Sequence, residues 1–211
     1  MPRRFPALTA LPGPTGPAER SAAAGELDAP TLARAQAGDE EACHALVVRY
    51  QDRVWWVLGR IVGQRAQRTM ISTADLAQET FLRVFRQLAR FSADGPARLS
   101  TWILTIATRV AIDELRHRCP EVLSDGAVAT EISAARTDDK VHSDDALAAV
   151  ERALAGLPAD WRAVLLLRLE HELDYEEIAR ALDVAVGTVR SRLARARAAL
   201  WTTLAELREA P

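Results

Sequence analysis

Four arginines and no acidic residue occupy residues 186–200, VGTVRSRLARARAAL, at positions 190, 192, 195 and 197. The 211-residue chain has a formal net charge of −2, so this basic stretch is a local concentration of charge. Guanidinium groups donate hydrogen bonds to phosphate oxygens and, in pairs, to the acceptors on a guanine edge. The residue types and their spacing therefore indicate contact with a nucleic acid.

A helical wheel at about 100° per residue divides this stretch into two faces. The face predicted to be buried is apolar and contains Val189, Leu193, Ala196 and Leu200. The opposite face is small, and the arginines lie on its shoulders: Gly187, Ser191, Ala194 and Ala198, with Arg190 and Arg197 on one side and Arg192 and Arg195 on the other. Small residues let a helix approach base edges while the arginines reach phosphates or guanines. An ordinary solvated basic face is the alternative.

The residues just upstream predict a second, shorter helix. Asp174 and Glu177 have the spacing of a capping box, and Tyr175, Ile178, Ala179 and Leu182 would face inward. Residues 183–185 then form a three-residue turn before the basic helix. A helix, a tight turn and a second helix form the motif that places its second helix in the major groove of DNA.

Residues 30–118 show apolar positions every three or four residues and no strand-type alternation. Ser72 or Thr73 and Ser100 are the expected helix caps. The predicted buried stripes are Leu46, Val47, Tyr50, Val54, Val57, Leu58 and Ile61; Leu76, Ala77, Thr80, Phe81, Val84, Phe85 and Leu88; and Trp102, Ile103, Ile106, Ala107, Val110 and Ala111. A helical bundle buries three such stripes, so the fold class is all-α.

Segments without periodicity mark the expected domain boundaries. Residues 1–29 are rich in proline, alanine and glycine, which predicts a flexible tail. Residues 119–143 carry mostly acidic charges and predict a flexible acidic linker. The chain should therefore form two small helical domains, residues 30–118 and 144–206.

Composition and missing motifs exclude several other classes. No apolar run approaches the roughly 18 residues of a membrane span, and prolines interrupt the segment behind Arg3 and Arg4, so we expect a cytoplasmic protein without membrane insertion. Two cysteines, Cys43 and Cys119, are too few for a disulfide framework, and no metal or cofactor is expected. The string EHELDY lacks the second histidine of a zinc protease motif, and no P-loop is present, so we expect no enzyme.

Two blocks of sequence resemble a known family when taken together. The run LDYEEIARALDVAVGTVRSRLARARAAL resembles region 4 of bacterial extracytoplasmic-function sigma factors. ADLAQETFLRVFRQLARF and STWILTIATRVAIDELRHR resemble region 2 of the same family. The resemblance covers about residues 30 to 206 and implies a factor that directs RNA polymerase core to promoter DNA. It also implies a cognate anti-sigma factor as an inhibitor.

The resemblance implies roles for the residues of this chain that match the family's motifs. Region 2 of such factors docks on polymerase core and captures the melted minus-10 element, and region 4 binds the minus-35 element. The DLAQE motif and the next helical turn imply polymerase contacts at Asp75, Gln78, Glu79 and Arg83. The loop 92–100 and the following helix imply minus-10 contacts, with candidate side chains Thr105, Thr108, Arg109 and Arg116. The basic helix implies minus-35 contacts at Thr188, Arg190, Ser191, Arg192, Arg195 and Arg197.

Three departures from the family pattern limit this transfer. Arg109 follows Thr108 where many relatives have asparagine, and a guanidinium lacks the acceptor that an amide presents to a base. Asp183 replaces the usual turn glycine, although aspartate tolerates the left-handed conformation. Ala185 replaces the usual serine or threonine cap. The remaining alternative is a helix-turn-helix regulator with an N-terminal sensor domain, against which the DLAQETF block argues.

Overall fold

The computed structural model describes residues 25–63, 71–95, 97–118, 144–169 and 173–209. Within these ranges all regular secondary structure is helical, which confirms the all-α prediction. The predicted acidic linker, residues 119–143, lies outside the described residues, as do Cys119 and residues 1–24 of the predicted tail.

The chain divides into two compact units. The first unit contains residues up to 59 together with 70–111, and the second contains residues 60–69 and everything from 112 onward. This division runs through two helices and does not follow the limits 30–118 and 144–206. Those limits stay predictions.

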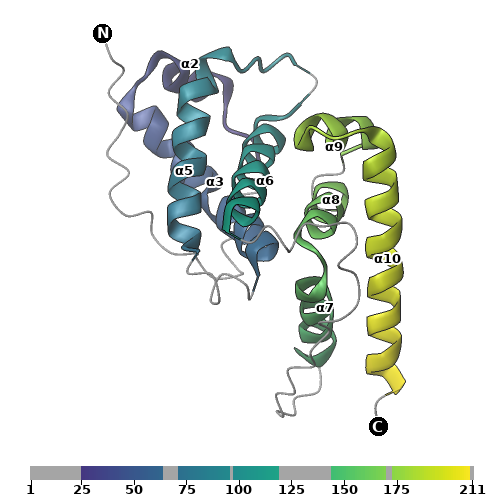
Figure 1. Cartoon of the computed structure of the whole chain (residues 1–211). Helices are drawn as coiled ribbons and strands as arrows, with labels where there is room; N and C mark the ends of the chain where they lie inside the picture. Colours follow the sequence, from purple (N-terminus) through teal and green to yellow (C-terminus); the bar gives the residue numbers. More distant parts are fainter. Residues whose placement is uncertain (1–24, 64–70, 96, 119–143, 170–172, 210–211) are drawn as a thin grey trace. The chain divides into compact units, whose positions relative to one another are not determined.

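In the described part of the first unit, the chain forms three long helices, one short helix and a 3-10 turn (Figure 1). In chain order they are α2 (Ala29–Ala37), α3 (Glu40–Val62), α5 (Thr73–Gln87), η1 (Leu88–Arg90) and α6 (Leu99–Arg118). Every residue of the predicted stripes on α3 and α5 is buried. On α6, Trp102 is only half buried, and its ring lies 5.1 Å from that of Phe91.

The two ends of α5 are fixed by side chains. Ser72 caps the helix by accepting a hydrogen bond from the Asp75 amide at 3.2 Å, as predicted. Beyond the other end, the Gln36 amide of α2 donates to the carbonyls of Leu88 and Phe91, at 3.0 and 2.7 Å. The carbonyls that follow α5 are therefore satisfied by a residue 52 or 55 positions upstream.

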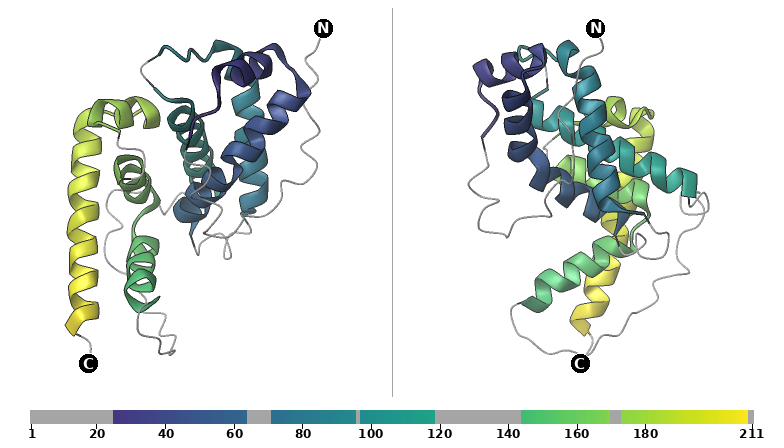
Figure 2. Two further views of the ribbon diagram at one scale, coloured as in Figure 1. Left: turned by 180° about the vertical axis from the view of Figure 1, so that it is seen from behind. Right: turned by 90° about the vertical axis from the view of Figure 1, so that its left-hand side faces the viewer.

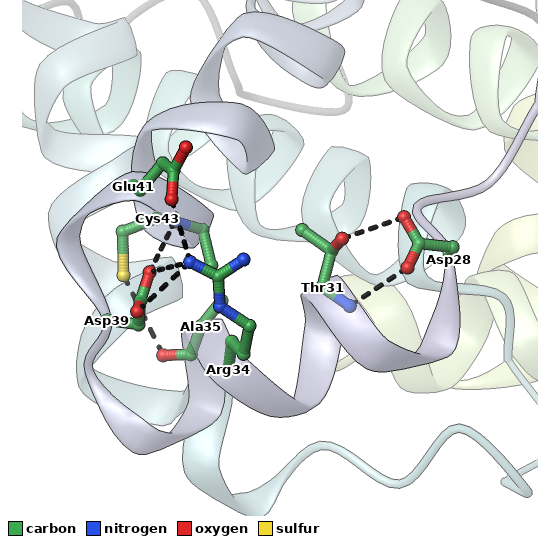
Figure 3. Close-up of polar contacts among 8 residues, drawn as sticks. Asp28, Thr31, Arg34, Ala35, Asp39, Glu41 and Cys43 are labelled. Carbon is green, nitrogen blue, oxygen red and sulfur yellow. Dashed lines mark hydrogen bonds and ion pairs between the residues drawn. The ribbon is translucent and has the colours of Figure 1, made fainter.

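The start of α2 corrects the predicted tail. Asp28 is the N-cap of this helix and accepts from both the amide and the hydroxyl of Thr31, at 2.9 and 2.8 Å (Figure 3). These hydrogen bonds hold the pKa of Asp28 below its ordinary value. The prediction of a tail up to residue 29 is wrong for residues 25–29, because their polar groups bond specifically to the helices.

Charged side chains join α2 to α3 (Figure 3). Gly38 ends α2 in the left-handed conformation with φ 90°, and Asp39 then accepts from the Ala42 amide at 2.9 Å. The Arg34 guanidinium lies between Asp39 and Glu41, at 3.0 and 2.8 Å. Cys43 is buried beneath this corner, and burial raises the pKa of its thiol. It is therefore a structural thiol.

From residue 144 onward, the described residues of the second unit form four helices, and the last is the longest. They are α7 (Asp144–Gly156), α8 (Ala159–Leu169), α9 (Tyr175–Leu182) and α10 (Val186–Glu209). Helix α10 packs against α7, α8 and α9, and Figure 2 shows it running alongside α7 and α8 with α9 at its N-terminal end. The basic helix is thus held along one side by three others.

Candidate nucleic-acid interface

The turn between α9 and α10 has the predicted geometry. Asp174 and Glu177 form a reciprocal capping box, with amide-to-carboxylate distances of 2.8 and 2.7 Å. Asp183 ends α9 in the left-handed region at φ 54°, ψ 51°, which confirms the role expected for an aspartate in place of glycine. Ala185 contributes its carbonyl to the start of α10, where it accepts from the Thr188 amide at 2.9 Å.

The two faces of α10 also follow the wheel. Val189, Leu193 and Ala196 are buried, and Leu200 is half buried. The small face is exposed over its whole length: Gly187, Ser191, Ala194 and Ala198. The Ser191 hydroxyl donates to the Thr188 carbonyl at 3.0 Å, which keeps that side chain close to the helix. A smooth exposed surface therefore extends over about three turns.

Three of the four arginines border this surface, and the fourth does not. Arg190, Arg195 and Arg197 are exposed. Arg192 is buried and forms an ion pair with Asp160 in the first turn of α8, with 2.5 Å between Nη2 and Oδ2. The two side chains are only 10% and 6% exposed. This corrects the prediction that Arg192 lies on the outer shoulder of the helix.

The burial of Arg192 has a geometric reason. On the wheel Arg192 lies only about 60° from Val189, so its side chain starts near the edge of the buried stripe. Helix α8 packs against α10, and Asp160 is within reach of the guanidinium. Burying a charge is costly unless it is paired, and the pairing draws Arg192 inward. The wheel gives the direction of each side chain but not which neighbouring helix supplies a partner.

Asp160 is a functional candidate that the sequence interpretation missed. It lies in LPADWRAVLLL, where an acid stands beside a strongly apolar helix, and it is itself 5% exposed. An acid in the first turn also interacts favourably with the helix dipole. An acid next to a long apolar run is expected to be buried, and a buried acid needs a basic partner; this was the signal in the sequence that could have identified Asp160.

The predicted polymerase-binding side chains lie along the solvent side of α5. Asp75 and Gln78 are exposed, and Glu79 and Arg83 are partly exposed. Arg83 forms an ion pair with Glu79 one turn earlier, with 2.7 Å between Nε and Oε1. Surface pairs of this kind contribute about 0–1 kcal/mol, so they do not explain the fold. All four residues lie on one face of α5. Their role in binding polymerase stays a prediction.

The predicted minus-10 side chains all lie on α6, but only some of them are exposed. Arg109 and Arg116 are exposed and Thr105 is partly exposed. Thr108 is buried at 1% exposure, and its hydroxyl donates to the Leu104 carbonyl at 2.8 Å. Thr108 therefore lies on the buried side of α6 and not beside the other candidates, because Leu104, Ile112 and Leu115 are buried on the same side of the helix. A buried threonine satisfies its hydroxyl through the preceding turn.

Two further features bear on the kind of site. Among the described residues, no three His, Cys, Asp or Glu side chains are arranged to hold a metal ion. No described helix is both long enough and apolar enough to cross a membrane. The candidate surfaces thus consist of exposed polar and basic side chains on three helices, α5, α6 and α10.

Comparisons with known proteins match the same two parts of the chain. The family model described as sigma-70 region 2 matches residues 46–119, and the one described as sigma-70, region 4 matches residues 147–200. The chain is 32% identical over 180 residues to the ECF RNA polymerase sigma factor SigW of Bacillus subtilis, covering 81% of this chain and 92% of the relative. It is 35% identical over 194 residues to the RNA polymerase sigma-H factor of Pseudomonas aeruginosa, covering 86% and 96%.

Solved structures show the same fold. The sigma factor RpoE in complex with the anti-sigma factor NepR from Bartonella quintana matches with a TM-score of 0.53 at 24% identity, covering 76% of this chain and 95% of that one. CnrH in complex with the cytosolic domain of CnrY matches with the same TM-score at 23% identity, covering 83% and 96%.

Proposed function

Because the chain belongs to the extracytoplasmic-function family of RNA polymerase sigma factors, we propose that α5, α6 and α10 divide polymerase docking and promoter recognition between them. The chain is a transcription initiation factor and not an enzyme. The observation that supports this division best is the exposed small face of α10, the second helix of a helix-turn-helix, which is bordered by three exposed arginines. The match of residues 46–119 to region 2 sets aside the alternative of an N-terminal sensor domain.

Helix α10 binds the minus-35 element in this proposal. The strip containing Gly187, Ser191 and Ala194 faces the major groove, so the backbone approaches the base edges. The side chains that contact DNA are Thr188, Arg190, Ser191, Arg195 and Arg197. Arg192 does not contact DNA and instead fixes α10 to α8 through Asp160.

Helices α5 and α6 supply the other two contacts. Asp75, Gln78, Glu79 and Arg83 on α5 dock on polymerase core. The loop 92–98 and the exposed side of α6, with Thr105, Arg109 and Arg116, capture the melted minus-10 strand. Arginine at position 109 contributes charge and stacking to a single strand, and it lacks the paired donor and acceptor of an amide.

The same proposal extends to location and regulation. The chain acts in the cytoplasm, where polymerase and chromosomal DNA meet. A cognate anti-sigma factor keeps it inactive until a signal releases it. Support for this partner comes from the structural neighbour RpoE, a sigma factor whose structure was solved in complex with the anti-sigma factor NepR.

Replacing single arginines of α10 should separate two kinds of contact. Arg190→Ala, near the helix start, should cost about 1–3 kcal/mol of binding at one base position of the minus-35 element. Arg197→Ala, nearly two turns later, should weaken all promoters about equally and lower the salt slope by about 1. The measurement is binding of the holoenzyme to a panel of minus-35 variants at several salt concentrations.

The matched control is Arg152→Ala, which removes an exposed arginine from α7 in the same unit. It should leave both affinity and salt slope unchanged. If the Arg190 and Arg197 variants behave like this control, α10 is only a solvated basic face, and its assignment to the minus-35 element is wrong.

A further inference from the structure

One carboxylate of the N-terminal segment joins two helices that are distant in sequence. Glu26 Oε2 accepts from the Tyr50 hydroxyl of α3 at 3.0 Å and from the Ser100 amide of α6 at 3.1 Å. Its Oε1 accepts from the Ser100 hydroxyl at 2.5 Å. Charge-assisted bonds of this kind are stronger than bonds between neutral groups. Glu26 is thus held by donors that lie 24 and 74 residues away.

Neighbouring backbone groups reinforce this contact. The Leu27 amide donates to the Tyr50 hydroxyl at 3.0 Å, and Arg49 Nε donates to the Gly25 carbonyl at 3.0 Å. Tyr50 is fully buried, and burial raises its pKa to about 12. Its hydroxyl is therefore protonated at neutral pH and donates to Glu26 while it accepts from Leu27.

Ser100 occupies the first turn of α6, where helix amides lack partners within the helix. A carboxylate at this position satisfies one of those amides and interacts favourably with the positive end of the helix dipole. The sequence interpretation takes Ser100 as the cap of this helix, but the helix begins at Leu99. The hydroxyl of Ser100 bonds to Glu26 instead. A residue outside the helix therefore performs the capping.

The loop between α5 and α6 is held at one end by α2 and at the other by the residues that precede α2. At its start, the Phe91 carbonyl accepts from Gln36 at 2.7 Å, and at its end Ser100 is bound by Glu26. Between these anchors the described residues Ser92 to Gly95 are exposed, with a turn in which the Gly95 amide donates to the Ser92 carbonyl at 3.1 Å. The position of this exposed loop thus depends on residues 26 and 36.

We propose that Glu26 is a positioning residue for capture of the minus-10 element. It fixes the first turn of α6, and through it the exposed loop residues Ser92 to Gly95 and the exposed side of α6, in the arrangement that accepts the melted strand. This role rests on the proposed function of α6. Glu26 lies at the surface and fills no part of the apolar core, so its removal affects the loop more than the bundle.

The test compares Glu26→Ala with Glu26→Gln in the full-length holoenzyme. Glutamine keeps an acceptor for Tyr50 and the Ser100 amide, and its amide group can donate to the Ser100 hydroxyl. The probe is a promoter that the wild-type holoenzyme transcribes, with 2-aminopurine in the minus-10 element to report opening. Glu26→Ala should reduce opening about tenfold, Glu26→Gln should restore most of it, and Glu40→Ala, an exposed acid on α3, should change nothing.

Two further measurements separate positioning from general stability. Affinity for polymerase core and binding to a minus-35 duplex should be unchanged in Glu26→Ala. Hydrogen exchange should rise at the first turn of α6 and not in α5. Normal opening by Glu26→Ala, or an equal loss of core affinity and opening, would overturn the positioning role. A wild-type holoenzyme that opens no promoter would instead show that the proposed function itself is wrong, and the role of Glu26 with it.

Discussion

Asp160→Ala is expected to lower the free energy of unfolding by about 3–5 kcal/mol, a larger loss of stability than any other single change considered for this chain. The substitution leaves the Arg192 guanidinium buried beside α8 without the carboxylate that neutralises it. Because Arg192 lies on α10, the same change should weaken binding to the minus-35 element although Asp160 contacts no DNA. The measurements are urea unfolding followed by circular dichroism and holoenzyme affinity for promoter DNA.

Two controls show whether the ion pair is responsible. Glu176→Ala removes an exposed acid from the first turn of α9 and should lower stability by no more than about 1 kcal/mol. The double variant Asp160→Leu with Arg192→Met removes both charges and should recover most of the stability, since apolar residues often replace a buried pair without loss. An Asp160→Ala protein as stable as Glu176→Ala would show that the pair contributes nothing.

Reversing two charges on α5 is expected to abolish association with polymerase core. Asp75→Lys with Glu79→Lys places two positive charges on the face that we propose docks on core, and like charges across an interface cost several kcal/mol. The fold should survive. Losing an acid from the first turn costs about 0.3–1 kcal/mol, and losing the surface pair of Glu79 with Arg83 costs at most about 1 kcal/mol. Co-purification with core and thermal unfolding measure the two effects.

Glu40→Lys is the matched control for this pair of substitutions. Glu40 is also an exposed acid in the first turn of a long helix of the first unit, so its replacement has a similar effect on the helix dipole. It should leave core association intact. If the Asp75 and Glu79 double variant co-purifies with core as well as Glu40→Lys does, the docking face lies elsewhere.

Local sequence patterns were sufficient for the helices and for the turn that orients α10. The stripes of α3 and α5, the Ser72 cap and the capping box at Asp174 each depend on residues within one or two turns, and each is found as predicted. The left-handed conformation of Asp183 is also a local property of the turn. Periodicity and capping rules describe contacts of this range well.

The corrected residues depend on partners from other helices. Arg192 is buried because α8 presents Asp160, and Glu26 is ordered because α3 and α6 present Tyr50 and Ser100. A pattern within one segment contains no information about a donor 74 residues away. Thr108 has a local partner in Leu104, but its burial reflects the packing of that side of α6 against the rest of the unit.

The central claim is that the chain gives polymerase core the ability to start transcription at specific promoters. The direct measurement is in vitro transcription of fragmented genomic DNA from the source organism by purified core, with and without the chain, followed by sequencing of RNA 5′ ends. We expect new 5′ ends that share two upstream sequence elements at a fixed spacing, only when the chain is present, and weak binding of the free chain to the same fragments. Unchanged 5′ ends, together with tight sequence-specific binding by the chain in the absence of core, would contradict the claim and indicate a simple DNA-binding regulator.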